Sequence, residues 1–331
     1  MNILVVGGGA WGTAISYILA SNHHKILIWS KNEKVVESIN RSSTNQVYFP
    51  LINLPSNIEA TLTVSSLDSI DVVFIVIPSV AVRNTVEHLQ KIGIRKDIKI
   101  VICSKGIEIN SLKLMSEIVA EILPNDYAVL SGPNFANEVM QEKMTVSLCA
   151  STYPEMNTFV SKLMMRNHFL VLPNNQLIRI QVASAIKNII AIACGIIEGA
   201  DLGNNLKAAV LSCGHAEINQ FIKLRGYKES KNSETESIDL CGIGDLMLTC
   251  CTPLSRNMRY GYEIGRYGVV KVANKIGLVE GVNTVKSLKS ARISLPIIDA
   301  VHSIVSNRPL NTQGLYNLLY NSILKHCKEY A

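Results

Sequence analysis

The chain has 331 residues, enough for two domains, and a formal net charge of +6 at pH 7. Its basic residues are spread along the sequence rather than clustered, and this distribution argues against nucleic-acid binding. Its eight cysteines stand at irregular positions without a C-x-x-C pair, which argues against a zinc site and against a secreted disulfide framework. An apolar strand pattern occupies the N-terminus where a signal peptide would stand, so we expect a cytoplasmic protein. Because the cysteines lack metal-site spacing, we also expect no metal ion.

The first residues carry the strongest local signal. The apolar run Ile3 to Val6 leads into Gly7-x-Gly9-x-x-Gly12, and a helix-forming stretch follows. Strand, glycine turn and helix in this order are typical of a dinucleotide phosphate site. The first glycine permits the tight turn, the second lets the pyrophosphate approach the backbone, and the third lets the helix pack on the strand. The N–H groups of the helix N-terminus are then available to the anion.

The rest of the first half alternates strands and helices. The run 71–77, DVVFIVI, is almost uninterrupted in its apolar character, as in a strand buried on both faces. We predict strands at 25–29, 71–77, 98–103, 128–131, 144–150 and 168–172, and helices at 80–91, 111–123 and after Pro154. Repeated βα units of this kind predict a parallel, doubly wound sheet with right-handed crossovers.

After Pro173 only helical periodicity remains, at 177–199, 205–224, 257–266, 281–290, 296–306 and 312–327. The predicted fold class is therefore α/β, with an N-terminal Rossmann-like domain at residues 1–175 and an all-helical substrate-binding and catalytic domain at residues 176–331. The longest apolar stretch, 180–197, contains polar residues and predicts a buried helix rather than a membrane span. The polar segment 229–237 predicts an exposed loop without chemistry of its own.

Two lysines are candidates for chemistry. Lys105 follows a predicted strand, at the sheet edge where ligands of open α/β folds bind, although a solvated loop lysine fits this position equally. Lys187 lies in an otherwise apolar helix and must either reach solvent or face a polar cavity. If it is desolvated, its pKa falls and it can exchange a proton near neutral pH. Asn188 lies about 100° further around the helix and can share the rim of such a cavity.

Three further segments combine glycines with polar side chains. Ser255-Arg256-Asn257 begins a predicted helix and offers an N-cap, a bidentate cation and an amide to a phosphate or carboxylate, although ordinary capping explains it as well. Asp245 follows two glycines, which permit a close backbone approach. Glu280 lies between glycines and is either a carboxylate that contacts a ligand hydroxyl or an acid at a helix start.

Together these segments resemble the bacterial-type NAD(P)-dependent glycerol-3-phosphate dehydrogenases over the whole chain. The matching pieces, in the family's order, are GGGAWGTA (7–14), CSKGIE (103–108), SGPNFANEV (131–139), AIKNIIAIACGIIEG (185–199), GIGDLMLTC (242–250), SRN (255–257) and VEGV (279–282). The resemblance implies the reversible reduction of dihydroxyacetone phosphate to sn-glycerol 3-phosphate with NADPH or NADH, which supplies phospholipid synthesis. It further implies a homodimer without membrane insertion.

The resemblance also implies roles for single residues. Lys187 is expected to protonate the developing alkoxide and to act as base in reverse, with Asp245 orienting its ammonium group and the substrate hydroxyl. The implied substrate-binding residues are Lys105, Gly132, Asn134, Lys187, Asp245, Ser255, Arg256 and Asn257, with Arg256 and Asn257 nearest the phosphate. The implied cofactor contacts are Gly7, Gly9, Ala10, Trp11, Gly12, Lys31, Lys105, Ala136, Arg256, Leu278 and Glu280.

The chain departs from the family pattern at three places. Asn134 stands where the family usually has Ser or Thr, so its reach to the substrate differs. The insertion near 229–237 lengthens the gap between Lys187 and Asp245, and we expect it to leave the site intact. At the tip of the second strand, Ser30 and Lys31 replace the acidic residue that binds a ribose 2′-hydroxyl, which favours NADPH over NADH.

Two alternatives stay open from the residues alone. A two-domain dehydrogenase of the 6-phosphogluconate or 3-hydroxyacid type also carries a lysine on an apolar helix, although Ser-Arg-Asn and Gly-Ile-Gly-Asp favour a triose phosphate. A protein that senses NAD(P) without turnover needs a disabled catalytic centre, and the presence of both Lys187 and Asp245 argues against it.

Overall fold

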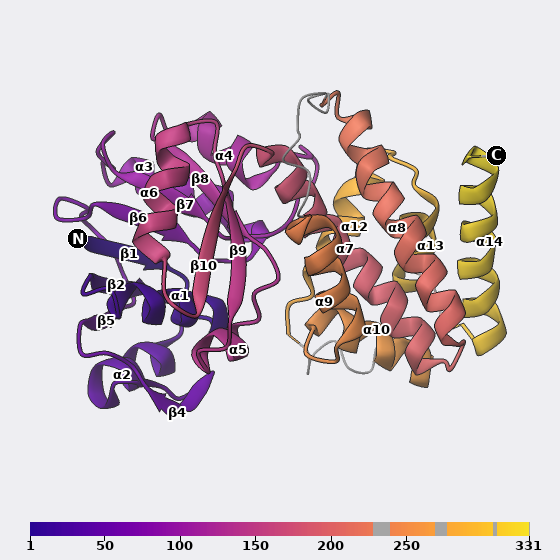
Figure 1. Ribbon diagram of the computed structural model, residues 1–331, viewed down its shortest axis with the longest axis horizontal. Helices are drawn as coiled ribbons and strands as arrows, with labels where there is room; N and C mark the ends of the chain where they lie inside the picture. The colour runs from indigo at the N-terminus through magenta and orange to yellow at the C-terminus, as the bar shows by residue number, and fades with distance from the viewer. Residues whose placement is uncertain (228–238, 269–276, 307–309, 331) are drawn as a thin grey trace. The chain divides into compact units, whose positions relative to one another are not determined.

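The computed structural model describes residues 1–227, 239–268, 277–306 and 310–330 (Figure 1). The chain divides into two compact units, Met1–Ser104 with Met115–Leu177, and Lys105–Leu114 with Ile178–Ala331. The predicted insertion at 229–237 lies outside the described residues. The segment Lys105–Leu114 packs with the second unit, although it follows a strand of the first unit and precedes residue 175.

The first unit is built on an eight-stranded sheet with the strand order β10-β9-β8-β7-β6-β1-β2-β5. Its strands are β1 (Asn2–Val6), β2 (Lys25–Trp29), β5 (Ile58–Thr61), β6 (Val72–Ile75), β7 (Lys99–Ile102), β8 (Tyr127–Ser131), β9 (Thr145–Ala150) and β10 (Phe169–Asn174). Its helices are α1 (Ala10–Ala20), α2 (Glu33–Ser42), α3 (Val82–Lys91), α4 (Met115–Ile122), α5 (Ala136–Met140) and α6 (Pro154–Met164), with a 3₁₀ turn at Ser79–Ala81. A short antiparallel pair, β3 (Thr44–Asn45) and β4 (Phe49–Asn53), lies between α2 and β5.

The central strands are buried on both faces, as the sequence predicted. Ile3 of β1 and Phe74 of β6 join side chains of α1 and α6 in one hydrophobic cluster. Leu4 and Val73, which alternate with them and point to the opposite face, are fully buried as well. Helices therefore cover both faces of the sheet, and the doubly wound, Rossmann-like fold class is confirmed.

The prediction of a wholly parallel sheet was wrong at one edge. β9 pairs with β8 in the antiparallel sense, and β10 is parallel to β9. The chain between β8 and β9 carries only the short helix α5, and an antiparallel neighbour needs no long crossover connection. The edge strand β5 and the β3–β4 pair were not predicted from the sequence.

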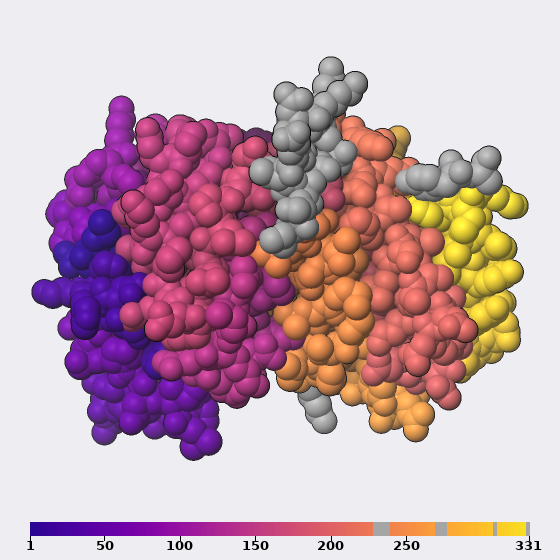
Figure 2. Space-filling model, in the orientation of Figure 1, coloured from indigo at the N-terminus to yellow at the C-terminus, as the bar shows by residue number. Residues whose placement is uncertain are grey.

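The second unit is mainly helical in its described residues. Its helices are α7 (Leu177–Gly199), α8 (Asn204–Leu224), a π-helical turn at Leu240–Gly244, α9 (Asp245–Cys251), α10 (Arg256–Tyr267), α12 (Glu280–Ser290), α13 (Pro296–Ser306) and α14 (Thr312–Tyr330). The six predicted helices agree closely with those found, whereas α9 and the turn before it were not predicted. By length and composition α7 is able to cross a membrane, but its apolar stretch is entirely buried within the protein. In the space-filling view, α8 (salmon), α9 (orange) and α14 (yellow) form much of the visible face of this unit (Figure 2).

Helices α7 and α10 approach each other backbone to backbone. A Cβ atom on Gly195 of α7 would lie 2.1 Å from the carbonyl oxygen of Met258, and one on Gly261 of α10 would lie 2.0 Å from that of Ile192. Neither position has room for a methyl group. This contact holds the first turns of α10 against the C-terminal half of α7, which follows Lys187.

Candidate functional site

The glycine turn after β1 leaves no room for side chains at its first and third glycines. Gly7 has φ of +120°, and a Cβ atom there would lie 2.3 Å from the carbonyl oxygen of Val76. A Cβ atom on Gly12 would lie 1.8 Å from the carbonyl oxygen of Gly7. A Cβ atom on Gly9 would have no neighbour within 4 Å, so this position faces open space. The arrangement has the tight turn, the close helix packing and the open approach that a bound pyrophosphate requires.

The start of α1 has the features of an anion site. Gly9 is the N-cap and provides no side-chain hydrogen bond to the helix, and the first turn contains no acidic residue. Ala10 and Trp11 lie half-buried in this turn, and the indole Nε1 of Trp11 is buried without a hydrogen-bond partner among the described residues. Free N–H groups at a helix N-terminus and an unpaired buried donor fit the phosphates of a dinucleotide.

The tip of β2 presents a hydroxyl and a cation. Ser30 is buried, and its Oγ accepts a hydrogen bond from the backbone N–H of Asn32 at 3.2 Å. Lys31 is exposed. Glu33 begins α2, whose N-cap is Asn32, so its carboxylate belongs to the helix start.

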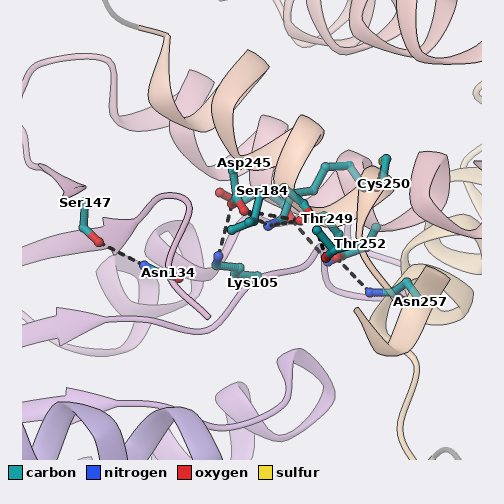
Figure 3. A network of polar contacts seen from close by, with 12 residues as sticks. Lys105, Asn134, Ser147, Ser184, Asp245, Thr249, Cys250, Thr252 and Asn257 are labelled. Atoms are coloured by element: carbon teal, nitrogen blue, oxygen red, sulfur yellow. Dashed lines mark hydrogen bonds and ion pairs between the residues drawn. The ribbon is translucent and has the colours of Figure 1, made fainter. Parts of the chain in front are cut away.

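At the end of β8 the chain passes close to β9. Gly132 has φ of +147°, and a Cβ atom there would lie 3.0 Å from the Cα atom of Ser147. The amide Nδ2 of Asn134 donates to the Oγ of Ser147 at 3.1 Å (Figure 3). Ala136 is the first residue of α5. The backbone and amide of this segment are thus fixed by the neighbouring strand.

The second unit holds a buried group of charges. Lys187 is 4% exposed, its Nζ pairs with Oδ1 of Asp245, and it donates to Oγ1 of Thr249 at 3.0 Å. Asp245 is 1% exposed, and its Oδ2 lies 3.2 Å from Nζ of Lys105 (Figure 3). Of the two predicted surroundings for Lys187, a polar pocket and solvent, the structure has the polar one. Lys105 is half-buried, so its cation partly faces solvent.

The surroundings of Lys187 change its acidity. Burial lowers the pKa of Lys187 to about 8, while the carboxylate of Asp245 acts in the opposite direction. A lysine with such a pKa carries its proton at neutral pH and releases it readily, which is suitable for general acid–base chemistry.

A chain of amides connects three helices next to this cluster. Oδ1 of Asn188 accepts from Nδ2 of Asn257 at 2.9 Å, and Oδ1 of Asn257 accepts from the backbone N–H of Gly281 at 3.0 Å. Ser255 caps α10, since its Oγ accepts from the backbone N–H of Met258 at 3.3 Å, as the sequence predicted. The chain of bonds fixes the start of α10 and the start of α12 against α7.

The remaining predicted residues of this unit lie at helix starts. Arg256 is exposed and makes no hydrogen bond or ion pair with the residues that the structure describes, so its guanidinium is available to a ligand. Leu278 is exposed just before α12. Glu280 is half-buried as the first residue of α12, which fits the helix-start interpretation; its contact with a ligand stays a prediction.

Three features of the cluster were missed in the sequence. Thr249 lies one helical turn after Asp245, and the spacing of four residues on α9 was the signal that could have identified it. Asp239 accepts from the backbone N–H of Gly242 at 2.6 Å and pairs with Arg179 of α7 at 3.1 Å, which holds the turn before Asp245. The segment that carries Lys105 is anchored in the second unit by Ile107 and Leu114, which are part of its hydrophobic core.

The predicted site residues therefore divide between the two units. The glycine turn, Lys31, Gly132, Asn134 and Ala136 belong to the first unit, and Lys105, Lys187, Asp245, Ser255, Arg256, Asn257, Leu278 and Glu280 belong to the second. Within the described ranges, His, Cys, Asp and Glu side chains form no group of three or more that could hold a metal ion.

Family models match both halves of the chain. The model of the NAD-dependent glycerol-3-phosphate dehydrogenase N-terminus matches residues 2–157, and that of the C-terminus matches residues 176–313. Curated relatives include the glycerol-3-phosphate dehydrogenase [NAD(P)+] of Neorickettsia sennetsu, 38% identical over 87% of this chain and 83% of the relative. That of Halalkalibacterium halodurans is 34% identical over 92% of this chain and 89% of the relative.

Solved structures agree with the family models. The glycerol-3-phosphate dehydrogenase of Coxiella burnetii has a TM-score of 0.86 and 27% identity, covering 99% of this chain and 98% of that one. A ketopantoate reductase from Ralstonia eutropha has a TM-score of 0.61 at 11% identity, with 99% and 100% coverage, and shares the fold alone. The fold by itself does not distinguish between these two kinds of enzyme, but the family models and the curated relatives do. The chain belongs to the family of NAD(P)-dependent glycerol-3-phosphate dehydrogenases.

Proposed function

We propose that the chain reduces dihydroxyacetone phosphate to sn-glycerol 3-phosphate, reversibly, with Lys187 as the group that gives and takes the proton. The observation that carries this proposal is the buried pair of Lys187 and Asp245, with Lys105 on the second carboxylate oxygen. An isolated buried ammonium is costly, and such perturbed, paired groups are concentrated at functional sites.

The chemistry follows from the charges. When bound, the nicotinamide supplies the hydride. Addition of a hydride to the ketone leaves negative charge on the carbonyl oxygen, which the ammonium of Lys187 neutralises by donating its proton. Asp245 orients that ammonium and favours its charged form. Thr249 accepts a hydrogen bond from the same ammonium group. With Asp245 and Thr249 holding two of its N–H groups, the remaining N–H of Lys187 has a defined direction.

The glycine turn of the first unit holds the dinucleotide, and the buried group of charges in the second unit binds the substrate. Arg256, whose side chain is exposed, is suited to a bidentate contact with the substrate phosphate, supported by Asn257 and Ser255 at the same helix start. Lys105 offers a further cation next to Asp245. In the first unit, the exposed Lys31 is suited to a 2′-phosphate, so NADPH is the preferred donor. Gly132, Asn134, Ala136, Leu278 and Glu280 complete the proposed contacts.

The proposed cellular role is the supply of glycerol 3-phosphate for phospholipid synthesis. The enzyme works in the cytoplasm as a homodimer, without insertion into a membrane and without a metal ion. The buried position of α7 supports the absence of a membrane span.

The variant Lys187→Ala tests the proton-transfer role. We expect kcat to fall by roughly two to four orders of magnitude, the range for a lost proton-transfer group, with NADPH binding retained. Lys91→Ala, which changes an exposed lysine at the end of α3, is the matched control and keeps wild-type kcat. Near-normal turnover of Lys187→Ala would contradict the role. Turnover of 6-phosphogluconate or of 3-hydroxy acids as fast as of glycerol 3-phosphate would contradict the substrate.

A further inference from the structure

Asn45 connects the glycine turn with the first turn of α1. It lies in β3, far from the turn in sequence, and its side chain is 0% exposed. Its Nδ2 donates to the carbonyl oxygen of Gly8 at 3.1 Å and to Oγ1 of Thr13 at 2.8 Å. The hydroxyl of Thr13 in turn donates to the carbonyl oxygen of Gly9 at 2.9 Å. A single buried amide therefore fixes two successive carbonyl groups of the turn, one directly and one through Thr13.

The turn needs an external constraint of this kind. It contains three consecutive glycines, 7–9, and glycine has the largest conformational freedom of all residues. In a trans peptide the carbonyl oxygen and the following N–H point in opposite directions. Because the oxygen of Gly8 points to the buried Asn45, the N–H of Gly9 points away from the protein interior. Gly9 is also the position that faces open space.

We propose that Asn45 is a positioning residue for the dinucleotide: it holds the Gly8–Gly9 peptide so that the Gly9 N–H faces the pyrophosphate. The inference rests on the proposed cofactor site at this turn. Asn45 contacts no ligand itself and acts through the peptide that it orients. Without its two hydrogen bonds the three-glycine turn samples other peptide orientations, and binding of the dinucleotide must select the competent one.

The variant Asn45→Ala tests the inference by direct titration with NADPH, followed by fluorescence. We expect the Kd for NADPH to rise about tenfold, the effect of about one lost hydrogen bond, with kcat at saturating NADPH within about twofold of wild type. Adenosine diphosphate ribose, which carries the same pyrophosphate without nicotinamide, is expected to lose affinity by the same factor.

Asn125→Ala is a matched control in the same unit. Asn125 is 2% exposed, and its Nδ2 also donates to two carbonyl oxygens, those of Arg95 at 2.7 Å and Ile98 at 2.8 Å. In both asparagines the Oδ1 atom is buried and has no hydrogen-bond partner in the part of the chain that the structure describes. The control removes the same kind and number of hydrogen bonds before β8 instead of at the turn, so it lowers stability and leaves the Kd for NADPH unchanged.

The outcomes separate this inference from the proposed function. If the wild-type chain binds neither NADPH nor NADH, the proposed cofactor site fails, and the role of Asn45 fails with it. If the wild type binds and Asn45→Ala keeps the same Kd, or Asn125→Ala raises Kd equally, only the positioning role is overturned. Asn45→Leu provides a second variant, should Asn45→Ala fail to fold: it keeps about the volume of the side chain and removes the donor to the carbonyl oxygen of Gly8, and an unchanged Kd in it overturns the inference as well.

Discussion

Replacement of Asp245 by Asn offers a quantitative test of the charge cluster. The change keeps the shape of the side chain and removes the negative charge that pairs with Lys187. Two unit charges about 4 Å apart interact by about 4 kcal/mol at an effective dielectric constant of about 20. Since one pKa unit corresponds to about 1.4 kcal/mol, the upper limit of the effect is about 3 units. Water and side-chain rearrangement reduce it, so we expect a fall of about 2 units.

The expected shift has a definite sign in the pH–rate profile. In the wild type the pKa of Lys187 is lowered to about 8, and Asp245→Asn lowers it further, to about 6. Reduction of the ketone needs the protonated amine, so kcat decreases as pH rises through this pKa. At pH 7 protonation alone reduces kcat about tenfold, because the protonated fraction falls from about nine-tenths to about one-tenth. At pH 5 the amine of the variant is again about nine-tenths protonated, so this loss is recovered.

The assay is kcat for dihydroxyacetone phosphate from pH 5 to 9.5 at saturating NADPH, from initial rates. Thr249→Val is the control, because it removes a hydrogen-bond partner of Lys187 without changing any charge and leaves the descending limb near its wild-type pH. A limb that stays at its wild-type position in Asp245→Asn would refute both the electrostatic argument and the assignment of the limb to Lys187.

Two further changes test other parts of the molecule. Lys31→Asp is expected to raise KM for NADPH about tenfold more than KM for NADH, because it replaces an attraction to the 2′-phosphate by a repulsion. Equal effects on the two coenzymes would show that Lys31 does not bind the 2′-phosphate. Glu217→Ala removes a fully buried carboxylate that accepts from the backbone N–H groups of Ile297 at 2.6 Å and Ile298 at 3.2 Å at the start of α13. Urea denaturation is expected to give a loss of about 3 kcal/mol, with a smaller loss for Glu217→Gln, and a loss below about 0.5 kcal/mol contradicts this capping role.

The helices of the second unit were predictable because their signals are local. Apolar periodicity gave the extents of α7 and α8, and Ser255 marked the start of α10 by its own hydrogen-bonding capacity. The glycine turn was predictable for the same reason, since strand, turn and helix follow one another directly. The antiparallel pairing of β8 with β9 depends on which strands meet in space, and no pattern within either strand encodes it.

The site was predictable only in part. The sequence marked Lys187 as unusual but left open whether it reaches solvent, because its partner Asp245 lies 58 residues away in the chain (245 − 187). The contacts of Thr249 and Asp239 were not predicted, since a threonine in an apolar helix and an aspartate before a glycine are common in structural positions. The resemblance to a family implies roles for these residues, but the contacts that make the roles chemically reasonable join residues far apart in the chain and appear only in the folded structure.

The segment Lys105–Leu114 has a consequence for the modularity of the chain. The polypeptide crosses between the two compact units at 104/105, 114/115 and 177/178, so a single cut does not separate them. A fragment that begins at residue 178 lacks Lys105, one of the two cations on Asp245, and leaves the core sites of Ile107 and Leu114 unfilled. An exchange of the helical unit between two relatives therefore preserves the charge cluster and the core together only when residues 105–114 are exchanged with it.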